Sequence, residues 1–89
     1  MRTSAHALAD MVAETRPADA LAVYLRQIEP LRGEVGERAY RRLARLLASA
    51  RACHHRLGTD RVFNSYLRAL RAEQKHKRKL MNILDAYKL

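Results

Sequence analysis

Several residue types are scarce in this sequence, and each shortage narrows the structures that it can form. The 89 residues include one Cys, no Trp, one Phe, three Gly and two Pro, and β-branched residues are few. A single Cys excludes a disulfide within the chain, while the abundant Ala, Leu, Arg, Glu and Lys are all strong helix formers. The composition therefore predicts one small all-α domain over residues 1–89.

Long apolar runs are also missing. No segment approaches the roughly 18 consecutive apolar residues of a transmembrane helix. Asp10 and Glu14 interrupt the N-terminal segment where a signal peptide would need a continuous apolar stretch. We therefore expect a cytoplasmic protein with no membrane association.

Acidic residues are half as frequent as basic ones. The chain has 18 Lys and Arg against 9 Asp and Glu, which gives a formal net charge of +9. An excess of this size favours a phosphate-rich partner such as nucleic acid, or it serves only to keep a helical surface solvated. The charge alone leaves both alternatives open.

Four helices are predicted, at residues 4–15, 17–31, 37–57 and 59–88. Ser4 is a good N-cap, and Pro17 suits the first turn of a helix. Gly58 suits a left-handed C-cap and Thr59 an N-cap, so the last two helices form an antiparallel hairpin. We expect tetratricopeptide-like hairpins of a short α-solenoid, or a four-helix bundle with a long C-terminal helix. The predicted core contains Leu8, Leu21, Leu25, Ile28, Tyr40, Leu43, Leu47, Phe63, Tyr66, Leu67 and Leu70.

The segment 59–88 contains neither Gly nor Pro and is predicted to be one continuous amphipathic helix. Its ~45 Å would exceed the ~32 Å of the helix at 37–57. Gln74 and Lys77 interrupt its apolar stripe and leave a distal apolar patch beyond the end of its neighbour. We expect this patch to close over the loop at 30–36 or, by preference, to bind a second copy or an upstream domain. The candidate interface residues are Met81, Ile83, Leu84 and Tyr87.

The same helix carries a basic face, because positions 61–89 hold eight Lys and Arg but only two acidic residues. The candidate nucleic-acid contacts are Arg68, Arg71, Lys75, Arg78 and Lys79. Such contacts to phosphate would be salt-dependent and independent of sequence. The favoured alternative is a solvated face on which Lys77 pairs with Glu73 four residues earlier. The arginines at 38, 41, 42 and 45 are expected to point away from the core.

Cys53, His54 and His55 are consecutive, which would suggest a metal site if they converged. Adjacent helical residues diverge by ~100°, so we expect His54 in the core and His55 in solvent. No glycine-rich phosphate loop or nucleophile with an oriented base is evident. We therefore predict no enzyme activity, no metal and no cofactor.

Three segments, "RPADALAVYLRQIEPL", "AYRRLARLLASAR" and "FNSYLRALRAEQKHKRKLMNILD", resemble the C-terminal helical region of bacterial SWIM zinc-finger proteins. The resemblance covers about residues 16–85. The zinc finger itself needs a Cys-x-Cys pair and a Cys-x-His pair, which one Cys cannot provide. The resemblance implies a noncatalytic helical scaffold that interacts with a protein partner or with an upstream domain of a longer chain. A nucleic-acid-binding accessory domain remains the alternative.

Overall fold

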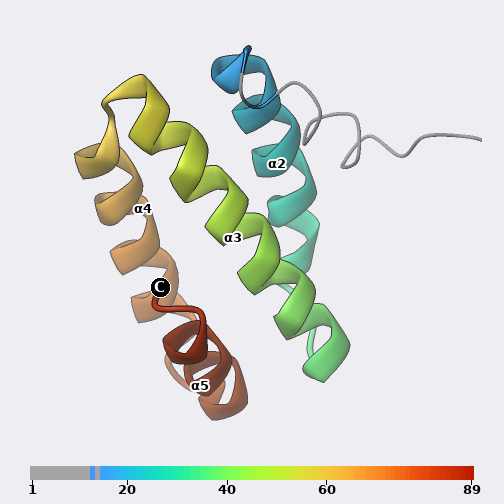
Figure 1. Ribbon diagram of the computed structural model, residues 1–89. Coiled ribbons are helices and arrows are strands. Elements are labelled where there is room, and N and C mark those ends of the chain that lie inside the picture. The colour runs from blue at the N-terminus through green and yellow to red at the C-terminus, as the bar shows by residue number, and fades with distance from the viewer. Residues whose placement is uncertain (1–12, 14) are drawn as a thin grey trace, which may run out of the picture.

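The computed structural model describes residue 13 and residues 15–89. Over this range the fold is all-α, with helices α2 (Pro17–Leu31), α3 (Glu37–Leu57), α4 (Asp60–Glu73) and α5 (Arg78–Ala86). α3 lies at the centre, with α2 along one side and α4 and α5 along the other (Figure 1). The helix predicted at 4–15 and the predicted core residue Leu8 lie outside the described residues.

The first hairpin joins α2 and α3. Pro17 begins α2, where its missing N–H costs no hydrogen bond, and α2 continues through Pro30 to Leu31. Ala20, Tyr24 and Ile28 recur every four residues and are fully or almost fully buried against α3. This spacing gives the helix a single apolar side, which is centred on Ala20, Tyr24 and Ile28, whereas the predicted core residues Leu21 and Leu25 lie at its edge.

The turn between α3 and α4 takes only two residues. Gly58 adopts the left-handed conformation, with φ 70°, and its N–H bonds to the carbonyls at the end of α3. Thr59 occupies the N-cap position of α4, as predicted, but its side chain makes no capping hydrogen bond to that helix. Its hydroxyl instead donates to the His54 carbonyl at 3.3 Å and lies 2.8 Å from His54 Nδ1. The turn therefore also holds the buried imidazole of His54 in place.

The prediction of one continuous helix over residues 59–88 is wrong. The helix stops at Glu73, a turn occupies 74–77, and α5 begins at Arg78. α5 then packs against α3, where Leu80, Ile83 and Leu84 are buried. No helix in the described range therefore overhangs its neighbour, since the distal patch has folded back into the core of the same chain.

The break has a physical cause in tertiary packing. Each large apolar side chain removed from water contributes ~1.5–3 kcal/mol, and three such side chains of α5 are buried. A continuous helix would regain a few backbone hydrogen bonds at a net ~0.5–1.5 kcal/mol each. Burial of α5 therefore outweighs the hydrogen bonds that the turn gives up.

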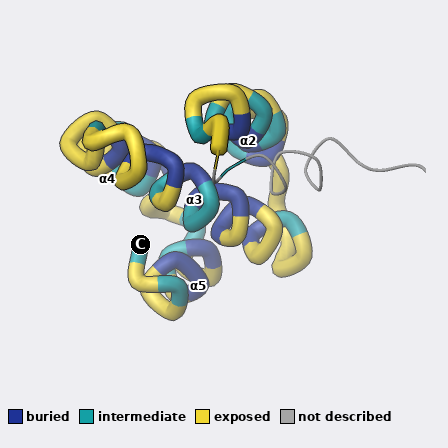
Figure 2. Tube along the Cα trace, turned by 45° about the horizontal axis from the view of Figure 1, so that its top comes forward, coloured by how far each residue is buried: buried dark blue, intermediate teal, exposed yellow. Residues whose placement is uncertain are grey.

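The core follows the predicted periodicity, with several differences. Of the predicted core residues, Ile28, Tyr40, Leu43, Leu47, Phe63 and Leu70 are buried. Leu21, Leu25, Tyr66 and Leu67 are only partly buried and pack around this core. Figure 2 shows the buried segments concentrated along α3 and on the sides of the other helices that face it. α5 supplies the part of the core that the sequence had suggested as an interface.

Candidate anion-binding surface

One side of α3 is left uncovered by the other described helices. Arg38, Arg42 and Arg45 are exposed on it at i, i+4 and i+7 spacing, which places them along one side of the helix. They have no hydrogen-bond or ion-pair partner within the described part of the chain. We call these three side chains the arginine face. They span ~10 Å along the helix axis.

α3 as a whole is strongly cationic, because it contains six Arg and Glu37 is its one acidic residue. Glu37 lies at the edge of the arginine face and binds Arg41 at 2.8 Å and Lys79 of α5 at 3.4 Å. The hydrogen bond from Arg41, and then that from Lys79, lowers the pKa of the Glu37 carboxyl. Glu37 therefore neutralises its own neighbours and leaves the arginine face uncompensated.

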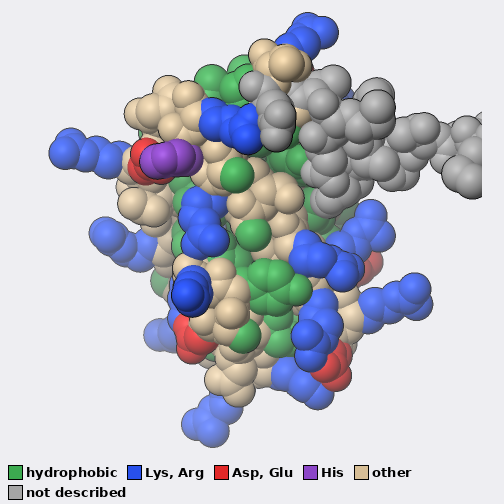
Figure 3. Space-filling model, viewed as in Figure 1, with side chains coloured by type: hydrophobic (Ala, Val, Ile, Leu, Met, Phe, Trp, Pro, Cys, Tyr) green, Lys and Arg blue, Asp and Glu red, His purple; other side chains and the backbone are tan. Residues whose placement is uncertain are grey.

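A shallow groove of about 330 Å³ runs between α2 and α3 beside this face. Arg26 of α2 and Arg42 of α3 both line it, together with Gln27, Pro30, Leu31 and Glu34. Arg26 is exposed and has no partner among the described residues, so it adds a fourth free cation close to the arginine face. On the face shown in the space-filling view, Lys and Arg side chains are scattered over the surface and acidic side chains are fewer (Figure 3).

The basic residues predicted to form one face on the last helix are separated by the break at 74–77. Arg68 is exposed on α4, Lys75 lies in the turn and Arg78 begins α5. Arg71 is already engaged, because it donates to Asp85 Oδ1 at 2.7 Å and to the Leu89 carbonyl at 2.8 Å. Lys79 is engaged with Glu37. These five residues therefore do not form the single stripe that a continuous helix would have given them.

Lys77 also differs from its prediction. Its ammonium donates to the backbone carbonyls of Arg32 and Glu34 at 3.1 and 3.2 Å, in the connection between α2 and α3. Glu73, its predicted partner, instead binds Arg32 at 2.6 Å. That hydrogen bond is the main cause of the lowered pKa of the Glu73 carboxyl. Arg32 and Lys77 thus link the residues on both sides of the break to the end of α2.

Two of the four predicted interface residues are buried within the fold of this chain. Leu84 is fully buried and Ile83 is 8% exposed, so neither is available to a partner in this conformation. Met81 and Tyr87 are partly buried and pack against the same core. The sequence pattern identified apolar residues that are covered in the structure, but it did not show that the covering surface is α3 of the same chain.

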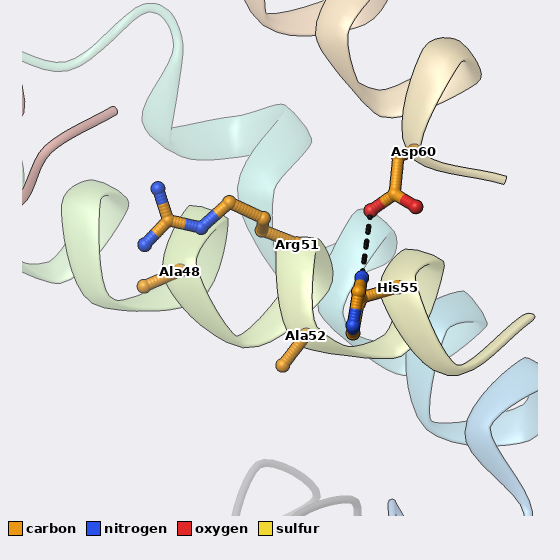
Figure 4. A pocket seen from close by; sticks show the side chains of 5 residues that line it. All are labelled: Ala48, Arg51, Ala52, His55 and Asp60. Carbon is orange, nitrogen blue, oxygen red and sulfur yellow. Dashed lines mark hydrogen bonds and ion pairs between the residues drawn. The ribbon is translucent and has the colours of Figure 1, made fainter. Parts of the chain in front are cut away.

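The histidines at 54 and 55 diverge as predicted. His54 is buried, 8% exposed, and lies beside Phe63 with ring centroids 5.5 Å apart. His55 is exposed, and its Nδ1 lies 3.2 Å from Asp60 Oδ1. Both residues line a shallow depression of about 340 Å³, and Arg51, which also lines it, points away from them (Figure 4). Within the described residues, no group of three or more His, Cys, Asp or Glu could hold a metal ion.

The arginine face was visible in the sequence only as a set of solvent-facing residues. The signal that could have identified it is the ratio of charges within α3, which has six Arg and one acidic residue.

No helix in the described part of the chain has the length and apolar character required to cross a membrane. Comparison with family models, with curated proteins and with solved structures finds no match.

Proposed function

We propose that this chain is a noncatalytic helical module that binds nucleic acid through the arginine face of α3. The observation that carries the proposal is the row Arg38, Arg42 and Arg45, exposed along one side of the helix and free of acidic partners among the described residues. Arginine is well suited to this role, because its planar guanidinium offers paired donors to phosphate oxygens. The module would act in the cytoplasm, where the buried, lone Cys53 stays reduced.

The binding would be directed at the phosphate backbone and would be independent of sequence. No aromatic side chain in the described part of the chain is among the exposed large apolar residues, which are Val35, Leu57 and Val62. Stacking of unpaired bases on aromatic side chains is the usual basis of single-strand binding. We therefore expect duplexes to bind at least as well as single strands.

A salt titration with fluorescent duplex and single-stranded probes tests the proposal. The test variant replaces Arg38, Arg42 and Arg45 by Gln. Each phosphate contact contributes about −0.9 to the slope of log K against log salt for duplex DNA. Without these three arginines, the slope should become shallower by about 2–3, and binding at low salt should weaken strongly.

A matched control removes the same charge from the other candidate residues. Arg68, Lys75 and Arg78 are exposed, have no partner among the described residues, and are replaced by Gln together. This control should retain most of the slope. If instead the control abolishes binding and the α3 variant keeps it, the site lies on α4 and α5 and the proposal is wrong.

A second candidate function is a protein-interaction scaffold, as the resemblance to the helical tail of SWIM zinc-finger proteins implies. The supporting observation is a third shallow cavity, of about 390 Å³, at the connection between α2 and α3. Val35, which is 74% exposed, lines it beside Glu34, Glu37 and Arg38. Leu31 and Ala39 line it as well, and this mixture of apolar and charged groups suits a protein surface better than a phosphate backbone. Absence of nucleic-acid binding at low salt would leave this function as the proposal.

A further inference from the structure

The turn between α4 and α5 contains none of the residues that usually end a helix. Gln74, Lys75, His76 and Lys77 are all compatible with helical geometry, and neither Gly nor Pro is present. Backbone hydrogen bonds at the turn run from Gln74 N to Leu70 O, from Lys77 N to Gln74 O and from Met81 N to Lys77 O. A continuous helix would form a complete i to i−4 series over the same residues.

The turn at 74–77 also contains a buried polar atom without a hydrogen-bond partner among the described residues. Gln74 is 5% exposed, and its Oε1 has no hydrogen bond within the described residues. A buried polar atom without a partner destabilises the conformation that contains it. The residue types at 74–77 and the unpaired Gln74 oxygen therefore favour a continuous helix through the break. The packing of α5 on α3 of the same chain opposes it.

That packing does not require α5 to come from the same chain. The α3 surface that receives Leu80, Ile83 and Leu84 is identical in every copy, so a second copy offers α5 the same apolar contacts. Exchange of an identical element conserves these contacts and closes with two-fold symmetry. The ion pair between Arg32 and Glu73 precedes the turn and is compatible with both arrangements.

We propose that two copies of this chain exchange α5, with residues 74–77 straightening to join α4 and α5 into one helix. The chain would thus exist as a closed monomer and as a dimer in which each α5 packs on α3 of the other copy. The contacts of the Lys77 ammonium exist only in the closed form, because Lys77 lies within the segment that straightens. Its ammonium holds the Arg32 and Glu34 carbonyls and lies 5.9 Å from the centre of the Tyr40 ring. The inference stands independently of the proposed function, since it involves no nucleic acid.

The test uses light scattering after size exclusion over a wide range of protein concentration. Samples are first incubated near the unfolding midpoint, where α5 can detach. The wild type should show a dimer whose fraction rises with concentration. Lys77→Ala removes the contact of the closed form and keeps a good helix former, so the dimerisation constant should rise about tenfold.

Arg78→Pro tests whether the dimer contains a straight helix. Arg78 is the first residue of α5, where Pro is tolerated, and Lys77 before it is non-helical with φ −88° and ψ 82°. In a continuous helix the same Pro would lie in the interior and clash with the carbonyl four residues earlier. Dimerisation should weaken about a hundredfold or more, whereas the matched control Arg78→Ala should leave it unchanged. Circular dichroism checks that both variants fold.

A second variant guards against misfolding caused by Pro. Lys75→Gly together with His76→Gly alters two exposed positions in the turn and disfavours a continuous helix, so dimerisation should fall at least about tenfold. The inference is overturned if the wild type and Lys77→Ala are both strictly monomeric. It is equally overturned if the dimer persists undiminished in Arg78→Pro and in the double Gly variant, because the dimer would then form without straightening.

Discussion

Replacing Leu84 by Ala tests the largest difference between the sequence-based prediction and the structure. An overhanging helix would leave this side chain near solvent, whereas in the structure its exposed fraction is 0%. Loss of a buried Leu side chain costs the transfer energy of the missing atoms and leaves a cavity, together about 2–5 kcal/mol. Ala is also an excellent helix former, so the effect is not confused by helix propensity.

The expected loss is large for a chain of this size. Domains typically have ~0.05–0.15 kcal/mol of stability per residue, which gives about 4–13 kcal/mol here. The midpoint of thermal unfolding should therefore fall by about 10 °C or more. Circular dichroism in the far ultraviolet, followed with temperature and with urea at low protein concentration, measures both quantities.

Val62→Ala is the matched control, because Val62 lies on α4 and is 60% exposed. Its stability should change by no more than about 0.5 kcal/mol. If Leu84→Ala were as mild as this control, α5 would not be part of the core, and the account of the break at 74–77 would be refuted.

Three further substitutions test single features of the fold. Gly58→Ala should destabilise the chain by about 1–2 kcal/mol, because Gly58 has φ 70° and no neighbour within 4 Å that could compensate; a neutral result would contradict the left-handed turn. The pKa of Glu37 is lowered chiefly by Arg41 and then by Lys79, so its stabilising effect should be full above the ordinary Glu pKa of about 4.3 and disappear as the pH falls through the lowered value. Thermal melts of the wild type and Glu37→Gln should accordingly converge at acid pH, and a constant difference would exclude this pairing. Tyr66→Phe should be neutral or stabilising by up to about 1 kcal/mol, since its hydroxyl is buried without a partner among the described residues; urea unfolding that shows a clear loss would indicate a bond that the fold does not account for.

The basic candidates show how far residue patterns can locate a site. The sequence showed which residues were cationic and which side of each helix was polar, because helical periodicity follows from the chain alone. It could not show which of these cations would form hydrogen bonds or ion pairs within the fold. Arg71 binds Asp85, fourteen residues away, and Lys77 binds carbonyls more than forty residues away. The sequence placed the arginines at 38, 41, 42 and 45 on the solvent side of α3, but only the tertiary structure showed that Arg41 is paired with Glu37 and that the arginine face is unpaired among the described residues.

The sequence by itself determined the all-α class, the bounds of the helices at 17–31 and 37–57, and the tight turn at Gly58. Each depends on local signals, namely apolar spacing, Pro17 in a first turn and Gly in a left-handed position. The break at 74–77 has no such signal, apart from an interruption of the apolar stripe at Gln74 and Lys77. Local preferences there favour a continuous helix, and burial of α5 against α3 makes the bent chain more stable. Because that energy comes from a surface distant in sequence, the path of the last third of the chain was decided by the tertiary structure.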